Sequence, residues 1–194
     1  MFNAPASLCH RLLAPRIGYL IGTVGESGPD LAPISNLTQV SSDPQVFVIA
    51  VYRKWQTYRN LRESAGFSLS VPRIEHADVV WRLGNRFSGF NVEAGQNKLE
   101  ASGGKFNHEY SGFGPVLADA TGWCECEIRS EVELPEGDHG VFLCRVLRGA
   151  FNPEFIREDG TYVTNSKPLM QVVLNAFATS SEHWEMDWLG PNHP

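Results

Sequence analysis

The sequence predicts a mainly β protein, an antiparallel six-stranded β-barrel with a few short helices, in which residues 1–194 form a single domain. Six segments have the composition or the alternation of strands, and short turn-rich links between several of them favour antiparallel neighbours. Two segments with helical periodicity are short and do not alternate with the strands in the rhythm of βαβ units. A chain of 194 residues is long enough to bury one substantial core.

The expected strands cover residues 17–24, 31–40, 46–52, 67–71, 124–134 and 139–147. Residues 46–52 are almost continuously apolar and β-branched, which is typical of a strand covered on both faces. Residues 124–134 alternate strictly between small or apolar side chains and charged ones, which predicts one buried and one exposed face. The turn at residues 135–138 joins this strand to the next in a long hairpin.

Helices are expected at residues 55–63 and 74–83. Trp55, Tyr58 and Leu61 fall on one side of the first helix, so they are interpreted as core residues. Residues 85–114 form a long irregular connection, which is either functional or an ordinary surface excursion. A last strand is expected within residues 169–177. Residues 1–15 are interpreted as an arm and residues 153–194 as an extension, with Trp184 and Trp188 docked on the body or on a second subunit.

Composition excludes several classes of function. Sixteen basic and twenty-two acidic residues give a net charge of −6 without a basic run, which argues against nucleic acid as a partner. No apolar run approaches the length of a membrane helix and no signal peptide begins the chain, so a cytoplasmic location without membrane association is expected. Four cysteines lack zinc spacing and are interpreted as buried thiols in a reducing compartment. Scattered histidines predict no metal site.

Candidate site residues concentrate between residues 32 and 60. Ser41, Ser42, Asp43 and Pro44 form either an ordinary turn or a set of ligand-binding hydroxyls and amides. Lys54 and Thr57 stand at the junction between a strand and a helix. Free N–H groups at a helix start, a cation and a hydroxyl together predict a site for an anion. Neither a nucleophile elbow nor a dinucleotide-binding glycine motif is present in the sequence.

From about residue 16 to residue 152 the chain resembles the flavin reductase-like family, whose fold is the FMN-binding split barrel. The matching features come in family order: Ala32-Pro33-Ile34-Ser35, the Val40–Pro44 turn, the apolar strand, a basic residue followed by Thr57 and Asn60, and Gly137-Asp138-His139. A weaker match covers residues 168–177. The chain departs from the family pattern at Gln45, where proline is frequent, and at Leu174, where glycine is expected.

The resemblance implies a split barrel with Greek-key connections, and a homodimer with flavin near the subunit interface. By resemblance, Ser35, Asn36, Val40, Ser41 and Ser42 line the isoalloxazine ring and the ribityl chain. Arg53, Lys54 and Thr57 bind the phosphate, with Asn60 nearby. His139 faces the flavin pocket, where it positions the nicotinamide or donates a hydrogen bond to it, and Phe87 stacks on a ring or packs in its loop.

The implied function is NAD(P)H-dependent reduction of FMN, with hydride transfer to flavin N5. The sequence does not distinguish FMN from FAD or NADH from NADPH, and a partner oxygenase is one candidate electron acceptor. A flavoredoxin-like carrier that exchanges electrons with a protein partner is an alternative. A split barrel that acts as a binding module without redox activity is another, and the Leu174 departure keeps it open.

Overall fold

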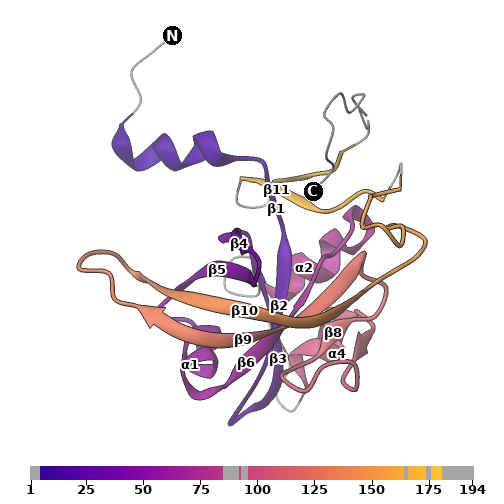
Figure 1. Ribbon diagram of the computed structural model, residues 1–194, viewed down its shortest axis with the longest axis horizontal. Helices are drawn as coiled ribbons and strands as arrows, with labels where there is room; N and C mark the ends of the chain where they lie inside the picture. The colour runs from indigo at the N-terminus through magenta and orange to yellow at the C-terminus, as the bar shows by residue number, and fades with distance from the viewer. Residues whose placement is uncertain (1–4, 85–91, 93–95, 164–165, 174–175, 181–194) are drawn as a thin grey trace.

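The computed structural model describes residues 5–84, 92, 96–163, 166–173 and 176–180. Its main sheet has seven antiparallel strands in the hydrogen-bonded order β3-β2-β6-β9-β10-β5-β4 (Figure 1). These strands are β2 (Tyr19–Gly25), β3 (Gly28–Ile34), β4 (Leu37–Ser42), β5 (Gln45–Tyr52), β6 (Gly66–Ser70), β9 (Gly122–Val132) and β10 (His139–Phe151). Neighbours that are not consecutive in the chain, such as β2 with β6 and β5 with β10, give the Greek-key connections.

Two smaller sheets and five short helices complete the described chain. A three-stranded sheet contains β1 (Arg16–Ile17), β11 (Met170–Val173) and β12 (Ala176–Ala178), and β7 (Phe106–Asn107) pairs with β8 (Val116–Leu117). The helices are η1 (Ala6–Leu13), α1 (Gln56–Glu63), η2 (Ile74–His76), α2 (Ala77–Leu83) and α4 (Lys98–Ser102). None of the helices in the described ranges is long and apolar enough to cross a bilayer.

The main sheet curls into a barrel because the chain joins its two edges directly. Strands β3 and β4 are at opposite ends of the hydrogen-bonded order, yet only Ser35 and Asn36 separate them in sequence. Residues 31–40, expected as one strand, therefore contribute to two strands. Side-chain alternation does not reveal this break, because both parts keep the composition of a strand. The expected mainly β, antiparallel split barrel is confirmed.

The core has two parts. The barrel interior contains Phe67, Phe142 and Ile49, all at most 1% exposed. A second cluster joins β2 and β3 to α2 and α4 through Leu20, Leu83 and other aliphatic side chains. Helix α1 packs on the first part, since Leu61 is buried there and Trp55 and Tyr58 pack against it, as expected.

The other expected elements are confirmed with small changes. The second expected helix is η2 followed by α2, and the last expected strand is divided into β11 and β12. Phe87, Leu174, Trp184 and Trp188 lie outside the described residues. Figure 1 shows η1 standing away from the barrel.

The cysteines only partly match their expected burial. Cys126 and Cys144 are buried and Cys124 is partly buried, but Cys9 is exposed on η1. All four thiols are free. Burial raises the pKa of the Cys144 thiol to about 12, so this group is protonated and unreactive at neutral pH.

A buried carboxylate fastens the loop before β8 to the hairpin of β9 and β10. Glu125 Oε2 accepts a hydrogen bond from Arg148 Nε at 2.7 Å, and Oε1 accepts from Arg148 Nη2 at 3.0 Å. The backbone N–H of Gly112 donates to the same Oε1 at 2.7 Å. The hydrogen bond from Arg148, more than any other contact, lowers the pKa of the Glu125 carboxyl.

This lowered pKa predicts a pH-dependent contribution to stability. The contribution is complete above the unfolded-state pKa of about 4.3 and is lost as the pH falls through the lower folded-state pKa. Glu125→Gln is expected to lower the free energy of unfolding at pH 7 by about 1–2 kcal/mol, with the difference from wild type shrinking below about pH 4. Urea denaturation across this pH range measures it.

Glu127→Gln is the matched control, because Glu127 pairs with Arg129 where both side chains are solvent-accessible. Such a pair contributes about 0–1 kcal/mol. A Glu125→Gln difference that is the same at pH 3 and pH 7 would contradict the assigned role.

Candidate functional site

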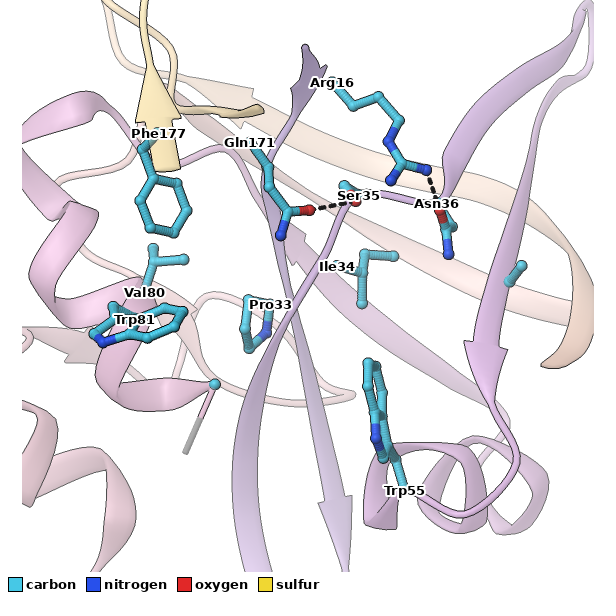
Figure 2. A pocket seen from close by; sticks show the side chains of 13 residues that line it. Arg16, Pro33, Ile34, Ser35, Asn36, Trp55, Val80, Trp81, Gln171 and Phe177 are labelled. Carbon is cyan, nitrogen blue, oxygen red and sulfur yellow. Dashed lines mark hydrogen bonds between the residues drawn. The ribbon is translucent and has the colours of Figure 1, made fainter. Parts of the chain in front are cut away.

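A cavity of about 210 Å³ lies between the barrel and α2, which we call the aromatic cavity (Figure 2). Trp55, Trp81 and Phe177 form much of its wall, together with Pro33 and Ile34. The rings of Trp81 and Phe177 meet edge to face, with centroids 6.3 Å apart. Flat apolar walls of this kind suit a planar aromatic ligand.

Polar groups meet at one side of the aromatic cavity. The break between β3 and β4 places Ser35 and Asn36 on its lining, as Figure 2 shows. Ser35 Oγ donates a hydrogen bond to Gln171 Oε1 at 2.9 Å, and Arg16 Nη1 donates to Asn36 Oδ1 at 2.6 Å. These contacts fix hydroxyl, amide and guanidinium groups beside an apolar wall, where they can bond the polar edge of a heteroaromatic ring.

A second cavity, of about 220 Å³, adjoins the first, and we call it the lysine cavity. It shares Pro33, Trp55 and Gly84 with the aromatic cavity, and Lys54, Thr57 and Lys98 also line it. Helix α1 begins here after Trp55, and no side chain caps its start. An uncapped helix start leaves N–H groups available to an anion, as the sequence predicted.

Arg53 and Lys54, the neighbouring cations of the predicted anion site, lie in different surroundings. Lys54 is exposed and lines the lysine cavity. Arg53 instead donates from Nη1 to the carbonyl oxygen of Gly137 at 3.1 Å, and its backbone N–H donates to the carbonyl of Asp138 at 2.9 Å. Of the predicted phosphate ligands, the structure therefore brings Lys54 and Thr57 together and directs Arg53 to the β9–β10 turn.

Asn60 has a packing role. It is 2% exposed, and its Nδ2 donates to Thr23 Oγ1 at 2.9 Å while its Oδ1 accepts from Gln56 Nε2 at 2.9 Å. The bond to Thr23 fastens α1 to β2, and the bond from Gln56 holds the Asn60 side chain within the helix. A side chain at Gly25 would begin 2.3 Å from Asn60 Oδ1, so glycine is required there for the helix to approach.

His139 lies beside the cavities but does not line them. It faces Tyr52 across the β10–β5 ladder, and the two ring centroids are 5.6 Å apart. Tyr52 in turn lies 5.8 Å from the ring of Trp55, the shared wall of both cavities. His139 Nδ1 is 2.6 Å from Asp138 Oδ1, and the hydrogen bond with His139 is the main cause that lowers the pKa of Asp138.

The remaining predicted ligands are elsewhere or outside the described residues. Val40, Ser41 and Ser42 are on β4, where Val40 is 53% exposed, and they line neither cavity. Ser42 Oγ accepts a hydrogen bond from Gln39 Nε2 at 3.2 Å. Phe87 lies outside the described residues.

The sequence pattern does not identify several residues that line the two cavities. Arg16, Trp81, Lys98, Gln171 and Phe177 come from separate parts of the chain, and no local motif joins them. The weak match at residues 168–177 is the one sequence signal that includes Gln171 and Phe177, and the pattern around Trp81 predicts only a helix. Arg16 and Lys98 had no signal.

A larger hollow of about 890 Å³ opens at a different place on the barrel. Tyr19, Phe47, Trp123, Phe151 and other mainly apolar residues line it. Among the described residues that line it, none is charged and none is a predicted site residue.

Comparisons with known proteins identify the family and the fold. The family model described as "Flavin reductase like domain" matches residues 13–170. An uncharacterized protein of Pyrococcus abyssi (strain GE5 / Orsay) is 26% identical over 145 residues, which cover 75% of this chain and 79% of the relative.

Two solved structures are similar in fold. An FMN-binding protein from Thermus thermophilus with bound 1-cyclohex-2-enone has a TM-score of 0.78 and 20% identity, covering 96% of this chain and 99% of its own. An NADH:FAD oxidoreductase of Streptomyces globisporus C-1027 has a TM-score of 0.69 and 17% identity, covering 91% and 95%.

The role found for Asn60 predicts a stability effect. Asn60→Ala is expected to lower the free energy of unfolding by about 1–3 kcal/mol, because it removes the buried hydrogen bond to Thr23 and leaves the Thr23 hydroxyl without its donor. Chemical denaturation measures this, and Arg59→Ala on the exposed face of α1 is the control. A wild-type stability for Asn60→Ala would refute the packing role.

Proposed function

The chain belongs to the flavin reductase-like family, and we propose that it is an NAD(P)H-dependent flavin oxidoreductase. The observation that carries the proposal is the junction of the aromatic and lysine cavities at Trp55. An aromatic slot with a polar edge, next to a cation at a helix start, has the chemistry that a flavin mononucleotide requires of a protein.

The residues present fit an FMN. Trp55, Trp81 and Phe177 would enclose the isoalloxazine ring, while Ser35 and Asn36 would meet its polar edge. Lys54, Thr57 and the first N–H groups of α1 would hold the phosphate, with the helix dipole adding to the charge of Lys54. Burial of the ring between these side chains would exclude water from the reacting face.

Bound flavin would supply the redox chemistry, accepting at N5 a hydride from reduced nicotinamide. The protein's part is to hold the two rings at a reactive distance and to keep competing water away. His139 is proposed to position the nicotinamide. Its link to the cavity wall through Tyr52 and Trp55 supports this role, as does the Asp138 hydrogen bond that fixes its ring.

Two further features are proposed for the assembled protein. A second copy of the chain would cover the large apolar hollow, whose lining includes Phe151 at 59% exposed. The homodimer would then work in the cytoplasm and pass electrons to an acceptor such as a partner oxygenase.

The proposed activity is tested by absorbance spectra of the purified protein with FMN, before and after anaerobic addition of NADH or NADPH. We expect flavin bands that bleach within the mixing period and return with air. Bands that persist would instead favour a flavoredoxin-like carrier. A protein that does not bind added FMN would refute the proposal.

Removing Lys54, the proposed phosphate ligand, is expected to weaken the binding of FMN but not of riboflavin. Lys54→Ala is expected to raise the Kd for FMN about tenfold or more, since a charge-assisted hydrogen bond is removed. Riboflavin, which has no phosphate, should bind both proteins equally. Quenching of flavin fluorescence measures both, and Lys105→Ala, an exposed lysine outside these cavities, serves as control.

The positioning role of His139 predicts a different signature. His139→Ala is expected to raise the KM for the nicotinamide donor about tenfold while the Kd for FMN stays at the wild-type value. Steady-state kinetics with saturating FMN separate the two, and His10→Ala on the exposed arm is the control. An unchanged KM, or an equal loss of FMN affinity, would argue against this role.

A further inference from the structure

Arg16 is the one charged side chain among the described residues that line the aromatic cavity. Lys54, the proposed phosphate ligand, lines only the lysine cavity. Figure 2 shows the Arg16 guanidinium across the aromatic cavity from Trp55, which belongs to the wall that the two cavities share. The charge of Arg16 is therefore placed apart from the phosphate seat, at the side of the cavity where the polar groups meet.

Both the backbone and the side chain of Arg16 are held by other parts of the chain. Arg16 is paired with Gln171 in the β1–β11 ladder, and its Nη1 donates to Asn36 Oδ1 at 2.6 Å. A guanidinium has five N–H groups, so the bond to Asn36 leaves others that can donate to a ligand. Because the side chain is positioned before a ligand binds, little conformational freedom is lost on binding.

No carboxylate of the described residues neutralises this guanidinium. Arg16 is in none of the ion pairs that these residues form, and its hydrogen-bond partner Asn36 is a neutral amide. The aromatic cavity thus has an uncompensated positive charge beside its apolar walls. A charge in such surroundings acts more strongly on a bound molecule than the same charge in water.

Reduction by hydride changes the charge of a flavin. The C4–H bond of the nicotinamide breaks, an N5–H bond forms with both electrons, and the nicotinamide becomes the oxidised cation. The isoalloxazine ring passes from neutral to anionic, and its added charge is shared by N1 and the C2 carbonyl at the polar edge of the ring. A cation at that edge stabilises the reduced ring more than the oxidised one, because only the reduced ring is charged.

We propose that Arg16 lies at the N1 and C2-carbonyl edge of the bound flavin and raises its reduction potential by stabilising the anionic reduced ring. This rests on the proposed function, since it takes the ring to lie in the aromatic cavity with its polar edge at Ser35 and Asn36. Arg16 bonds Asn36 directly, so the same placement brings its charge to that edge. The charge favours uptake of the hydride, whereas Lys54 holds the phosphate.

The test measures the reduction potential of FMN bound to wild type and to Arg16→Gln, by equilibration with a dye of known potential. Glutamine removes the charge but keeps an N–H group for Asn36. We expect the reduced flavin to lose about tenfold in affinity relative to the oxidised flavin, as loss of a charge-assisted hydrogen bond would give. This tenfold change lowers the potential by about 30 mV for a two-electron couple.

Two further variants separate the charge from other effects of the substitution. Arg16→Lys retains the charge and should restore most of the wild-type potential. Arg145→Gln removes an exposed arginine of β10 that lines neither cavity, and it should keep the wild-type potential. An Arg16→Gln potential equal to that of wild type would refute the inference, as would an Arg16→Lys potential as low as that of Arg16→Gln.

Binding of oxidised FMN and of riboflavin, measured by fluorescence quenching, locates the charge. A loss of affinity in Arg16→Gln for FMN that riboflavin does not share would place Arg16 at the phosphate and overturn the inference. Failure of wild type to bind flavin would refute the proposed function itself. If wild type binds FMN but is not reduced by NADH, the proposed activity fails, and the potentials still decide the role of Arg16 because they are measured without nicotinamide.

Discussion

The site depends on a single topological constraint, the passage of the chain from one edge of the sheet to the other. Strands β3 and β4 are at opposite ends of the hydrogen-bonded order, and Ser35 and Asn36 must connect them. Residues in such a crossing are outside the regular ladders, so other partners satisfy their polar groups. Asn36 accepts a backbone hydrogen bond from Ala50 at 2.9 Å, and this bond fastens the crossing to β5.

The residues of this crossing form hydrogen bonds with parts of the chain that are distant in sequence. Arg16 of β1 holds the side chain of Asn36, and Gln171 of β11 holds that of Ser35. The small three-stranded sheet thereby contributes Arg16, Gln171 and Phe177 to the lining of the aromatic cavity, where Phe177 faces Trp81. A polar edge and an aromatic wall thus arise together from one break in the barrel. On the other side, the end of β5 brings Lys54 and the start of α1 next to this wall.

Much of the fold was predictable from local pattern. The apolar run at residues 46–52 and the alternation at residues 124–134 both predict strands, and tertiary packing agrees with them. Strands β5, β9 and β10 occur where expected. The break at Ser35 was not predictable, because a strand that ends and one that continues have the same side-chain period. The division of residues 169–177 into β11 and β12 was missed for the same reason.

The site was predicted in part. Ser35, Asn36, Lys54 and Thr57 line the adjoining cavities, and an ordered set of short motifs was sufficient to select them. Arg53 and Asn60 have the residue types of phosphate ligands, but in the fold they bind the β9–β10 turn and Thr23. Sequence pattern cannot separate a side chain that binds a ligand from one that binds the protein, since both use the same donors and acceptors. Arg16 and Lys98 come from segments that only the fold brings together.

The most direct test of the account is a crystal structure of the protein soaked with FMN. The account predicts the isoalloxazine ring in the aromatic cavity, against Trp55 and beside Ser35 and Asn36, with the phosphate at Lys54 and Thr57. Flavin in the large hollow lined by Tyr19, Phe47 and Trp123 would contradict it, because the described lining residues of that hollow include no cation for the phosphate.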